Sequence, residues 1–223
     1  MPVPSSISAR DSSARGSLAN ALLFLLFFAG LALFYAKVIH PDLAPKRLAE
    51  VVPGAIYRSG ELSPGALADL AHKAHLKTII DLGIAPDGDP RDRRQQRTAQ
   101  ALGLTRYKFN LVGDSTGNPN EYAAAIRLAL DPKNQPVLIH CATGSQRTSC
   151  AIALLRLAAS PSPTDETLTR VITEARGFDA KDKVEEVIRA FAPAVLKSLE
   201  TGDPIPGFPP ARVEPAATPP TGP

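Results

Sequence analysis

The feature that most constrains the fold is an alternation of short apolar runs with longer amphipathic segments across residues 41–201. The runs at 77–82 and 136–140 are compact and apolar, as in strands that are buried on both faces. Shorter runs at 55–58 and 105–110 are also expected to be strands. Strands of this kind, separated by helices, predict one α/β domain over residues 41–201.

The segments between these runs carry helix start signals. Ser63-Pro64 and Asn118-Pro119 each place a capping side chain before a proline, which is favoured in the first helical turn. Helices are expected over residues 63–75, 89–102, 118–130, 151–159 and 181–199, with a further one beginning near residue 163. The expected architecture is a mostly parallel central sheet flanked by helices.

The composition excludes several classes of protein. Two cysteines among 223 residues cannot form a disulfide framework or a four-cysteine zinc site. His72 and His75 lie on one expected helix, but no third ligand is evident, so we expect neither a metal nor another cofactor. A net charge of +3 does not indicate nucleic-acid binding.

The C-terminal segment, residues 202–223, contains eight of the 22 prolines. Proline lacks a backbone N–H and is excluded from helix interiors and central strands. The segment is therefore expected to be a disordered tail. The alternative interpretation is a ligand for a proline-recognising groove on a partner protein.

The N-terminal region carries a long apolar segment, residues 18–39. As a helix, its 22 residues would reach about 33 Å, enough to cross a hydrocarbon core of about 30 Å. Tyr35 and Lys37 suit a membrane interface. We therefore expect a flexible segment over residues 1–17 and an uncleaved, single-pass transmembrane anchor, with a cleaved signal peptide or a core helix as alternatives. The flanking basic residues are too balanced to indicate which side of the membrane the domain faces.

One segment carries a candidate chemistry, because His140 to Thr148 follows an apolar strand and precedes an apolar helix. A loop in this position directs backbone N–H groups and the positive end of the helix dipole toward one point, which favours an anion. Cysteines at helix N-termini ionise readily, so Cys141 is a candidate nucleophile. Arg147 can bind two phosphate oxygens at once, and Gly144 permits a tight bend. The hydroxyl of Thr148 can donate to the sulfur.

This segment resembles the signature of the protein tyrosine phosphatase superfamily, in which His-Cys is followed by five residues, an Arg and a Ser or Thr. It looks most like the small dual-specificity branch, especially the bacterial members. The runs at 52–60 and 78–82 resemble the opening strands of that branch. The resemblance covers residues 50–175 and implies a phosphotyrosine phosphatase-like fold.

The resemblance also implies a mechanism. Cys141 attacks phosphorus and forms a phosphocysteine, while Arg147 and the amides of the loop stabilise the phosphoryl oxygens. The residues expected to bind substrate are Ala142, Thr143, Gly144, Ser145, Gln146 and Arg147.

In this branch, an aspartic acid on a loop upstream of the cysteine protonates the leaving oxygen. Asp114 occupies a loop-like stretch in the corresponding region and is the preferred candidate. Glu121 and Asp131 are the alternatives, although Asp131 lies close to the following strand. The competing interpretation of Asp114 is a turn residue that caps its own backbone.

Three further residues have two interpretations each. His140 either orients the loop beside the nucleophile or is a core histidine with satisfied hydrogen bonds. Cys150 is either a core residue or a redox partner of Cys141. Arg58 either supports the loop or belongs to an ordinary buried ion pair.

These observations predict a membrane-anchored cysteine phosphatase of phosphate monoesters. The loop interior, Ala-Thr-Gly-Ser-Gln, lacks the Lys or Arg that phosphoinositide phosphatases often have, which favours phosphotyrosine or phosphoprotein substrates. A lipid or inositol phosphate phosphatase on the same scaffold is the first alternative. A non-catalytic phosphate-binding module and a rhodanese-like or arsenate-reductase-like enzyme are the others.

Overall fold

The computed structural model describes residues 10–34, 45–160 and 163–216. The chain divides into two compact units, Met1–Ala44 and Pro45–Pro223, and each is described by itself.

In the first unit, the described residues form one helix, α1 (Arg10–Phe34), which begins inside the segment that was expected to be flexible. Residues 35–39 of the expected anchor lie outside the described residues. Among the residues that the structure describes, no helix combines the length and the apolar character that crossing a bilayer requires. The predicted transmembrane anchor is therefore unsupported.

The second unit contains one five-stranded sheet with the strand order β1-β2-β5-β3-β4. Strand β1 pairs antiparallel with β2, and the other neighbouring pairs are parallel. The predicted mostly parallel sheet is confirmed, whereas the antiparallel edge strand was not expected. In chain order the elements are β1 (Ala49–Val52), β2 (Ile56–Ser59), α3 (Pro64–Ala74), β3 (Thr78–Asp81), α4 (Pro90–Ala101), β4 (Thr105–Lys108), α5 (Pro119–Leu130), β5 (Val137–His140), α6 (Arg147–Ala158), α7 (Asp165–Gly177) and α8 (Asp182–Thr201).

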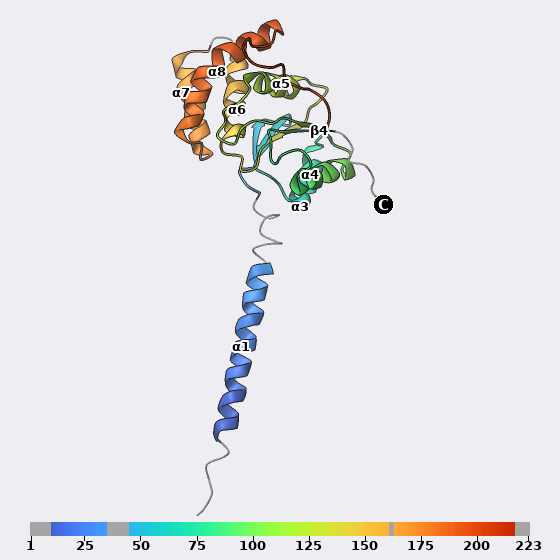
Figure 1. Ribbon diagram of the computed structural model, residues 1–223, viewed down its shortest axis with the longest axis vertical. Helices are drawn as coiled ribbons and strands as arrows, with labels where there is room; N and C mark the ends of the chain where they lie inside the picture. Colours follow the sequence, from blue (N-terminus) through green and yellow to red (C-terminus); the bar gives the residue numbers. More distant parts are fainter. Residues whose placement is uncertain (1–9, 35–44, 161–162, 217–223) are drawn as a thin grey trace, which may run out of the picture. The chain divides into compact units, whose positions relative to one another are not determined.

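Helices cover both faces of the sheet. Ile79 and Leu138 belong to the apolar cluster on the side of α3 and α4, whereas Ile80 and Ile139 belong to the cluster on the side of α5, α6, α7 and α8. The two groups of helices lie on opposite sides of the strands (Figure 1). All four side chains are at most 1% exposed. This double burial explains why the central strands have continuous rather than alternating apolar sequences.

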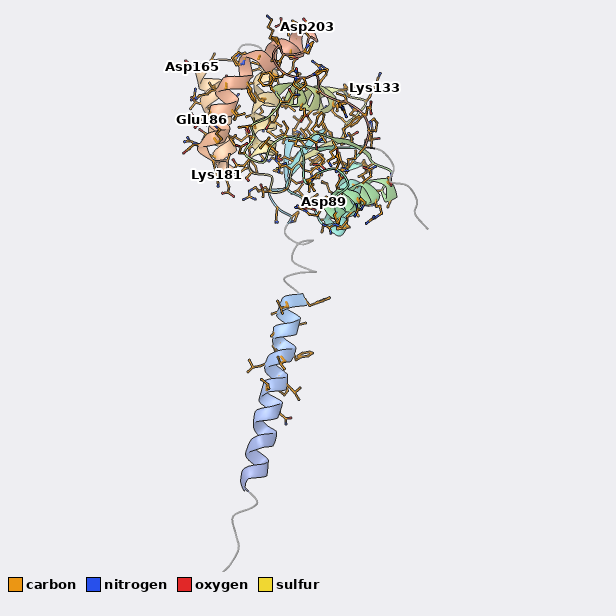
Figure 2. All side chains as sticks on the ribbon, in the orientation of Figure 1. Asp89, Lys133, Asp165, Lys181, Glu186 and Asp203 are labelled. Carbon is orange, nitrogen blue, oxygen red and sulfur yellow. The ribbon has the colours of Figure 1, made fainter. Side chains whose placement is uncertain are left out.

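Three helices begin at residues whose side chains cap them, and the sequence indicated two of these caps, Ser63 and Asn118. The side chains of Ser63, Asp89 and Asn118 each accept a hydrogen bond of 2.7–3.1 Å from a backbone N–H of the first turn. Each cap is followed by a proline at the first helical position. Asp89 is labelled at the start of α4 in Figure 2. Local chemistry therefore sets where these helices start.

The proline-rich segment differs from the predicted disordered tail over residues 202–216. Ile205 is only 6% exposed, and its N–H donates to Oδ1 of Asn120 at 2.7 Å. Farther along, Pro215 forms an antiparallel bridge with Tyr107 of β4. Prolines cannot donate, but their carbonyls accept hydrogen bonds and the residues between them can be buried, so the segment packs without forming a helix.

Two predictions for the C-terminal segment are not tested by the described residues. Residues 217–223 lie outside the described residues. The proline-recognising partner stays a prediction.

We predict that Ile205 contributes to the stability of the domain. Ile205→Ala should lower the free energy of unfolding by about 2 kcal/mol, because it removes a buried side chain and leaves a cavity. Val213→Ala is the matched control, since Val213 belongs to the same segment and is 44% exposed. Its effect should stay within about 0.5 kcal/mol. Urea unfolding of the three proteins measures both changes, and equal effects would contradict the packing of the segment.

Candidate active site

The motif lies at the carboxyl end of β5, the central strand of the sheet. Cys141 directly follows β5 and is 1% exposed, and Arg147 is the first residue of α6. Because β2 and β3 run parallel to β5, the segments that follow these strands meet the loop at the same edge of the sheet. Ligands of open α/β sheets bind at this edge.

Two glycines let the loop pack directly against the end of β2. Gly144 has a φ of 77°, in the left-handed region that favours glycine. A Cβ on Gly144 would lie 2.6 Å from the nitrogen of Gly60, and a Cβ on Gly60 would lie 2.8 Å from the carbonyl carbon of Thr143. Both distances are to backbone atoms, so a side chain at either position would displace the loop from the sheet.

Three successive carbonyl groups of the loop accept hydrogen bonds from donors outside it. The donors are the N–H of Glu61 to Ala142 (3.2 Å), Nη1 of Arg47 to Thr143 (2.9 Å) and Nη2 of Arg58 to Gly144 (2.5 Å). In a planar trans peptide the N–H points away from the carbonyl, so the amides that follow these carbonyls face the other side of the loop. The N–H of Gly144 accordingly donates to Sγ of Cys141 at 3.3 Å. Such an arrangement forms an anion-binding concavity.

Arg58 lies behind the loop and is 1% exposed. It also donates to Oγ of Ser149 at 2.9 Å, and its guanidinium carbon lies 3.7 Å from the centroid of the Phe178 ring. Within the described residues, no carboxylate lies at ion-pair distance from Arg58, so the contacts match a support of the loop rather than an ordinary ion pair. Burial lowers the pKa of Arg58 to about 10, which leaves it charged at neutral pH.

The connection between α7 and α8 also contacts the loop. Asp179 accepts a hydrogen bond of 2.5 Å from Arg47, which bonds to Thr143 as well. The side chain of Gln146 donates to the carbonyl of Asp179 (3.2 Å) and accepts from the N–H of Lys181 (3.3 Å). Sequence analysis missed Arg47, because a contact between residues 96 positions apart has no local signal.

Arg147 lines a cavity of about 540 Å³ at the carboxyl ends of β3 and β4. Its Nη1 donates to the carbonyls of Leu82 (3.2 Å), Gly83 and Leu111 (3.3 Å). Its Nε is buried and has no hydrogen-bond partner in the described part of the chain. The other lining residues are Gly83, Ile84, Ala85, Pro86, Asp87, Asn110, Leu111 and Gly113.

The remaining polar residues of the motif are buried, apart from the exposed Thr143 and the partly buried Gln146. The hydroxyl of Thr148 donates to the carbonyl of Ser59 at 3.5 Å. From the sequence, this hydroxyl was expected to donate to the sulfur of Cys141. The hydroxyls of Thr143 and Ser145 lie 2.8 Å apart and bond to each other. His140 is buried, and neither ring nitrogen bonds to any residue that the structure describes, so it does not match a core histidine with satisfied hydrogen bonds. Burial lowers the pKa of His140 and favours the neutral imidazole.

The preferred acid, Asp114, is exposed and is bonded within its own turn. Its Oδ1 accepts hydrogen bonds from the hydroxyl (2.5 Å) and the N–H (2.9 Å) of Thr116. These bonds lower the pKa of Asp114, which favours the carboxylate over the acid. The geometry matches the competing interpretation of a turn-capping residue.

The alternative carboxyl groups differ from Asp114. Burial raises the pKa of Glu121, which also accepts a hydrogen bond of 3.1 Å from the N–H of Asn110 in the cavity wall. Asp131 is exposed at the C-terminal end of α5, whereas Glu121 lies in its first turn. Compared with Asp114, Glu121 therefore has the environment that favours a protonated carboxyl group.

Cys150 lies in the core of the domain. Its thiol is fully buried, and burial raises its pKa to about 12. A thiol with such a pKa is inert at neutral pH, which favours the core interpretation over a redox partner of Cys141.

Comparison with known proteins agrees with this geometry. Residues 42–192 match the tyrosine phosphatase family, and the chain belongs to that family. It is 32% identical over 149 residues to the inositol diphosphatase SIW14 of Saccharomyces cerevisiae, covering 63% of this chain and 48% of that protein. It is also 32% identical over 118 residues to the inositol diphosphatase DSP3 of Arabidopsis thaliana, covering 51% of this chain and 56% of that protein. The chain thus spans about half the length of these relatives.

Solved structures agree on the fold. The core catalytic domain of SIW14 from S. cerevisiae, in complex with citrate, matches with a TM-score of 0.59 and 26% identity, covering 71% of this chain and 93% of that one. TpbA from P. aeruginosa matches with a TM-score of 0.53 and 17% identity, covering 71% of this chain and 99% of that one, which shows a shared fold.

We predict that Arg58 positions the anion-binding loop more than it stabilises the domain. Arg58→Met should weaken the binding of tungstate, a phosphate mimic, about tenfold, because the carbonyl of Gly144 loses its hydrogen-bond donor. The free energy of unfolding should change by less than about 1.5 kcal/mol, since removal of an unpaired buried charge offsets the lost bonds. Calorimetric titration and urea unfolding measure the two quantities.

The matched control is Arg189→Met, on the exposed face of α8. Unchanged tungstate affinity in Arg58→Met, with the control also unchanged, would show that Arg58 does not position the loop.

Proposed function

We propose that this protein is a cysteine-dependent phosphatase that hydrolyses the diphosphate groups of inositol diphosphates. The observation that supports this best is the structure of the loop. Sγ of Cys141 accepts a hydrogen bond from the N–H of Gly144, and the loop carbonyls accept hydrogen bonds from donors outside the loop. The substrate class follows from the relatives, of which several are inositol diphosphatases. The alternative of inositol phosphates thus has more support than the preference for phosphotyrosine that the loop composition indicated.

In the proposed reaction, the thiolate of Cys141 attacks the terminal phosphorus of the diphosphate. A sulfur–phosphorus bond forms as the bridging phosphorus–oxygen bond breaks, and the electron pair leaves on the oxygen of the inositol phosphate. Water then attacks the phosphocysteine, the electron pair of the broken bond returns to sulfur, and orthophosphate leaves with a proton released to solvent. The amides of the loop stabilise the phosphoryl oxygens in both steps.

Arg147 is proposed to bind the transferring phosphoryl group through the edge that carries Nε. This nitrogen has no partner among the described residues, whereas Nη1 is bonded to backbone carbonyls of the segments after β3 and β4. Those bonds orient the guanidinium beside the cavity that it lines. The planar fork of an arginine suits two phosphate oxygens.

The environment of Asp114 fits a diphosphate better than a phosphotyrosine. A tyrosine leaves as a phenoxide with a pKa of about 10, which calls for a proton donor. A phosphate monoester leaves with a second pKa of about 6 and needs little protonation. Asp114 is exposed and its pKa is lowered by hydrogen bonds from Thr116, so it is a poor proton donor. The diphosphate, which has the better leaving group, therefore suits this site better than phosphotyrosine.

Cys141→Ser should lower phosphate release from a diphosphoinositol polyphosphate by more than about 10³-fold, because a hydroxyl is a far weaker nucleophile than a thiolate. The Cys141→Ser variant should still bind the diphosphoinositol polyphosphate. The assay compares diphosphoinositol, phosphotyrosine peptide and lipid phosphate as substrates of the full chain, each with and without chelator. Faster turnover of the phosphotyrosine peptide would reject the inositol class. Absence of turnover on every substrate by the folded protein would reject the enzyme.

Asp114→Asn should lower the rate on diphosphoinositol by less than about threefold, because the leaving phosphate needs little protonation. A residue that acts as the general acid contributes about 10²-fold or more. Glu121→Gln is compared in the same assay, since burial raises the pKa of Glu121. A loss of about 10²-fold in either variant identifies that carboxyl as the acid and contradicts the argument from the leaving group.

A further inference from the structure

A second cavity adjoins the one that Arg147 lines. It has a volume of about 480 Å³ and lies between α4, β4 and the C-terminal segment. Asp87 and Asn110 line both cavities, so a ligand seated at Arg147 can extend into the second one.

The inner wall of this cavity contains a buried arginine, Arg106. Arg106 is 3% exposed and bonds through Nη2 to Asp81 (2.5 Å) and Asp92 (2.7 Å), and through Nη1 to Gln96 (3.2 Å). Its Nε is buried, and no residue in the described ranges accepts a hydrogen bond from it. Arg147 has an unpartnered Nε in the same way, so each of the two adjoining cavities is lined by an arginine with one N–H that no described residue accepts. Buried donors of this kind are normally bonded, which points to a ligand or water as the partner.

The outer wall is formed by the C-terminal segment, which continues the sheet beyond β4. The N–H of Ala216 donates to the carbonyl of Arg106 (2.7 Å), and Nε2 of Gln96 donates to the carbonyl of Ala216 (3.0 Å). These bonds place Arg212 in the lining, where it is exposed and makes no hydrogen bond or ion pair within the described residues.

The charges around the cavity leave cations available at its mouth. Lys108 pairs with Asp87 and Asp92, and Arg106 pairs with Asp92 and with the buried Asp81, so the carboxylates of the wall are already held in ion pairs. The other charged residues of the lining are Arg93, which also donates to the carbonyl of Gly88, Arg212 and the exposed Glu214, so cations outnumber carboxylates among them.

The loop around Cys141 also requires a second source of positive charge. Residues 142–146 are uncharged, and burial lowers the pKa of His140, which favours the neutral imidazole. Arg147 is therefore the one cation within the motif segment 140–148. A ligand that carries several phosphates therefore needs cations from outside the loop.

We propose that the second cavity is a subsite for a further phosphate of the substrate, bound by Arg212 and Arg93 at the mouth and Arg106 at the wall. The inference rests on the proposed function and extends it. A substrate with several phosphates on one ring occupies both cavities, whereas one with a single phosphate occupies only the cavity at Arg147. The C-terminal segment is thus part of the specificity of the site.

The test is calorimetric titration of the full chain with inositol hexakisphosphate, which carries several phosphates on one ring. Arg212→Glu should weaken its binding about tenfold, because an attraction is replaced by a repulsion. Lys197→Glu is the matched control, since Lys197 is an exposed residue of α8 without an ion pair in the described residues. It makes the same change in net charge and should leave the affinity unchanged. Arg93→Glu provides a second variant on the opposite wall and should also weaken binding.

Equal affinity in the wild type and both arginine variants would overturn the subsite. An equal loss in Arg212→Glu and Lys197→Glu would also overturn it, since only net charge would then matter. The proposed function fails separately: a wild-type chain that does not hydrolyse diphosphoinositol, yet binds hexakisphosphate with the predicted dependence on Arg212, rejects that activity and keeps the subsite.

Discussion

The outward bonding of three loop carbonyls is the interaction on which the rest of the site depends. Peptide geometry couples each carbonyl to an N–H on the opposite side, so donors behind the loop determine what the loop presents in front. Two of the three donors are arginines, Arg47 and Arg58, and one of them is buried without a carboxylate at ion-pair distance in the described structure. A charge in that environment costs stability. Its position behind the loop links that cost to the orientation of the anion-binding amides.

The sheet brings these donors together. Parallel pairing of β2 with β5 places the end of β2 beside Cys141, and the contact between Gly60 and Gly144 leaves no room for a side chain. The same topology places the segments after β3 and β4 around Arg147. The C-terminal segment then adds to the open edge of β4 and closes a second cavity beside the first.

Much of the fold could be predicted because its signals are local. The caps at Ser63 and Asn118 and the doubly buried run of β3 depend on neighbours in sequence. The antiparallel strand β1 and the packed segment around Ile205 depend on distant partners, and composition alone indicated a disordered tail for the latter. Prolines restrict regular structure but do not prevent burial of the residues between them.

The sequence by itself determined the chemical groups of the site: a cysteine, a glycine and an arginine at fixed spacing between a strand and a helix. It could not determine what surrounds them. Only the tertiary structure decided that Arg58 contacts Gly144, that Asp114 is bonded within its own turn, and that Arg212 lines a cavity next to the one at Arg147. The physical reason is that spacing along the chain sets local geometry, whereas burial, pKa and charge depend on groups that are brought together from distant parts of the sequence.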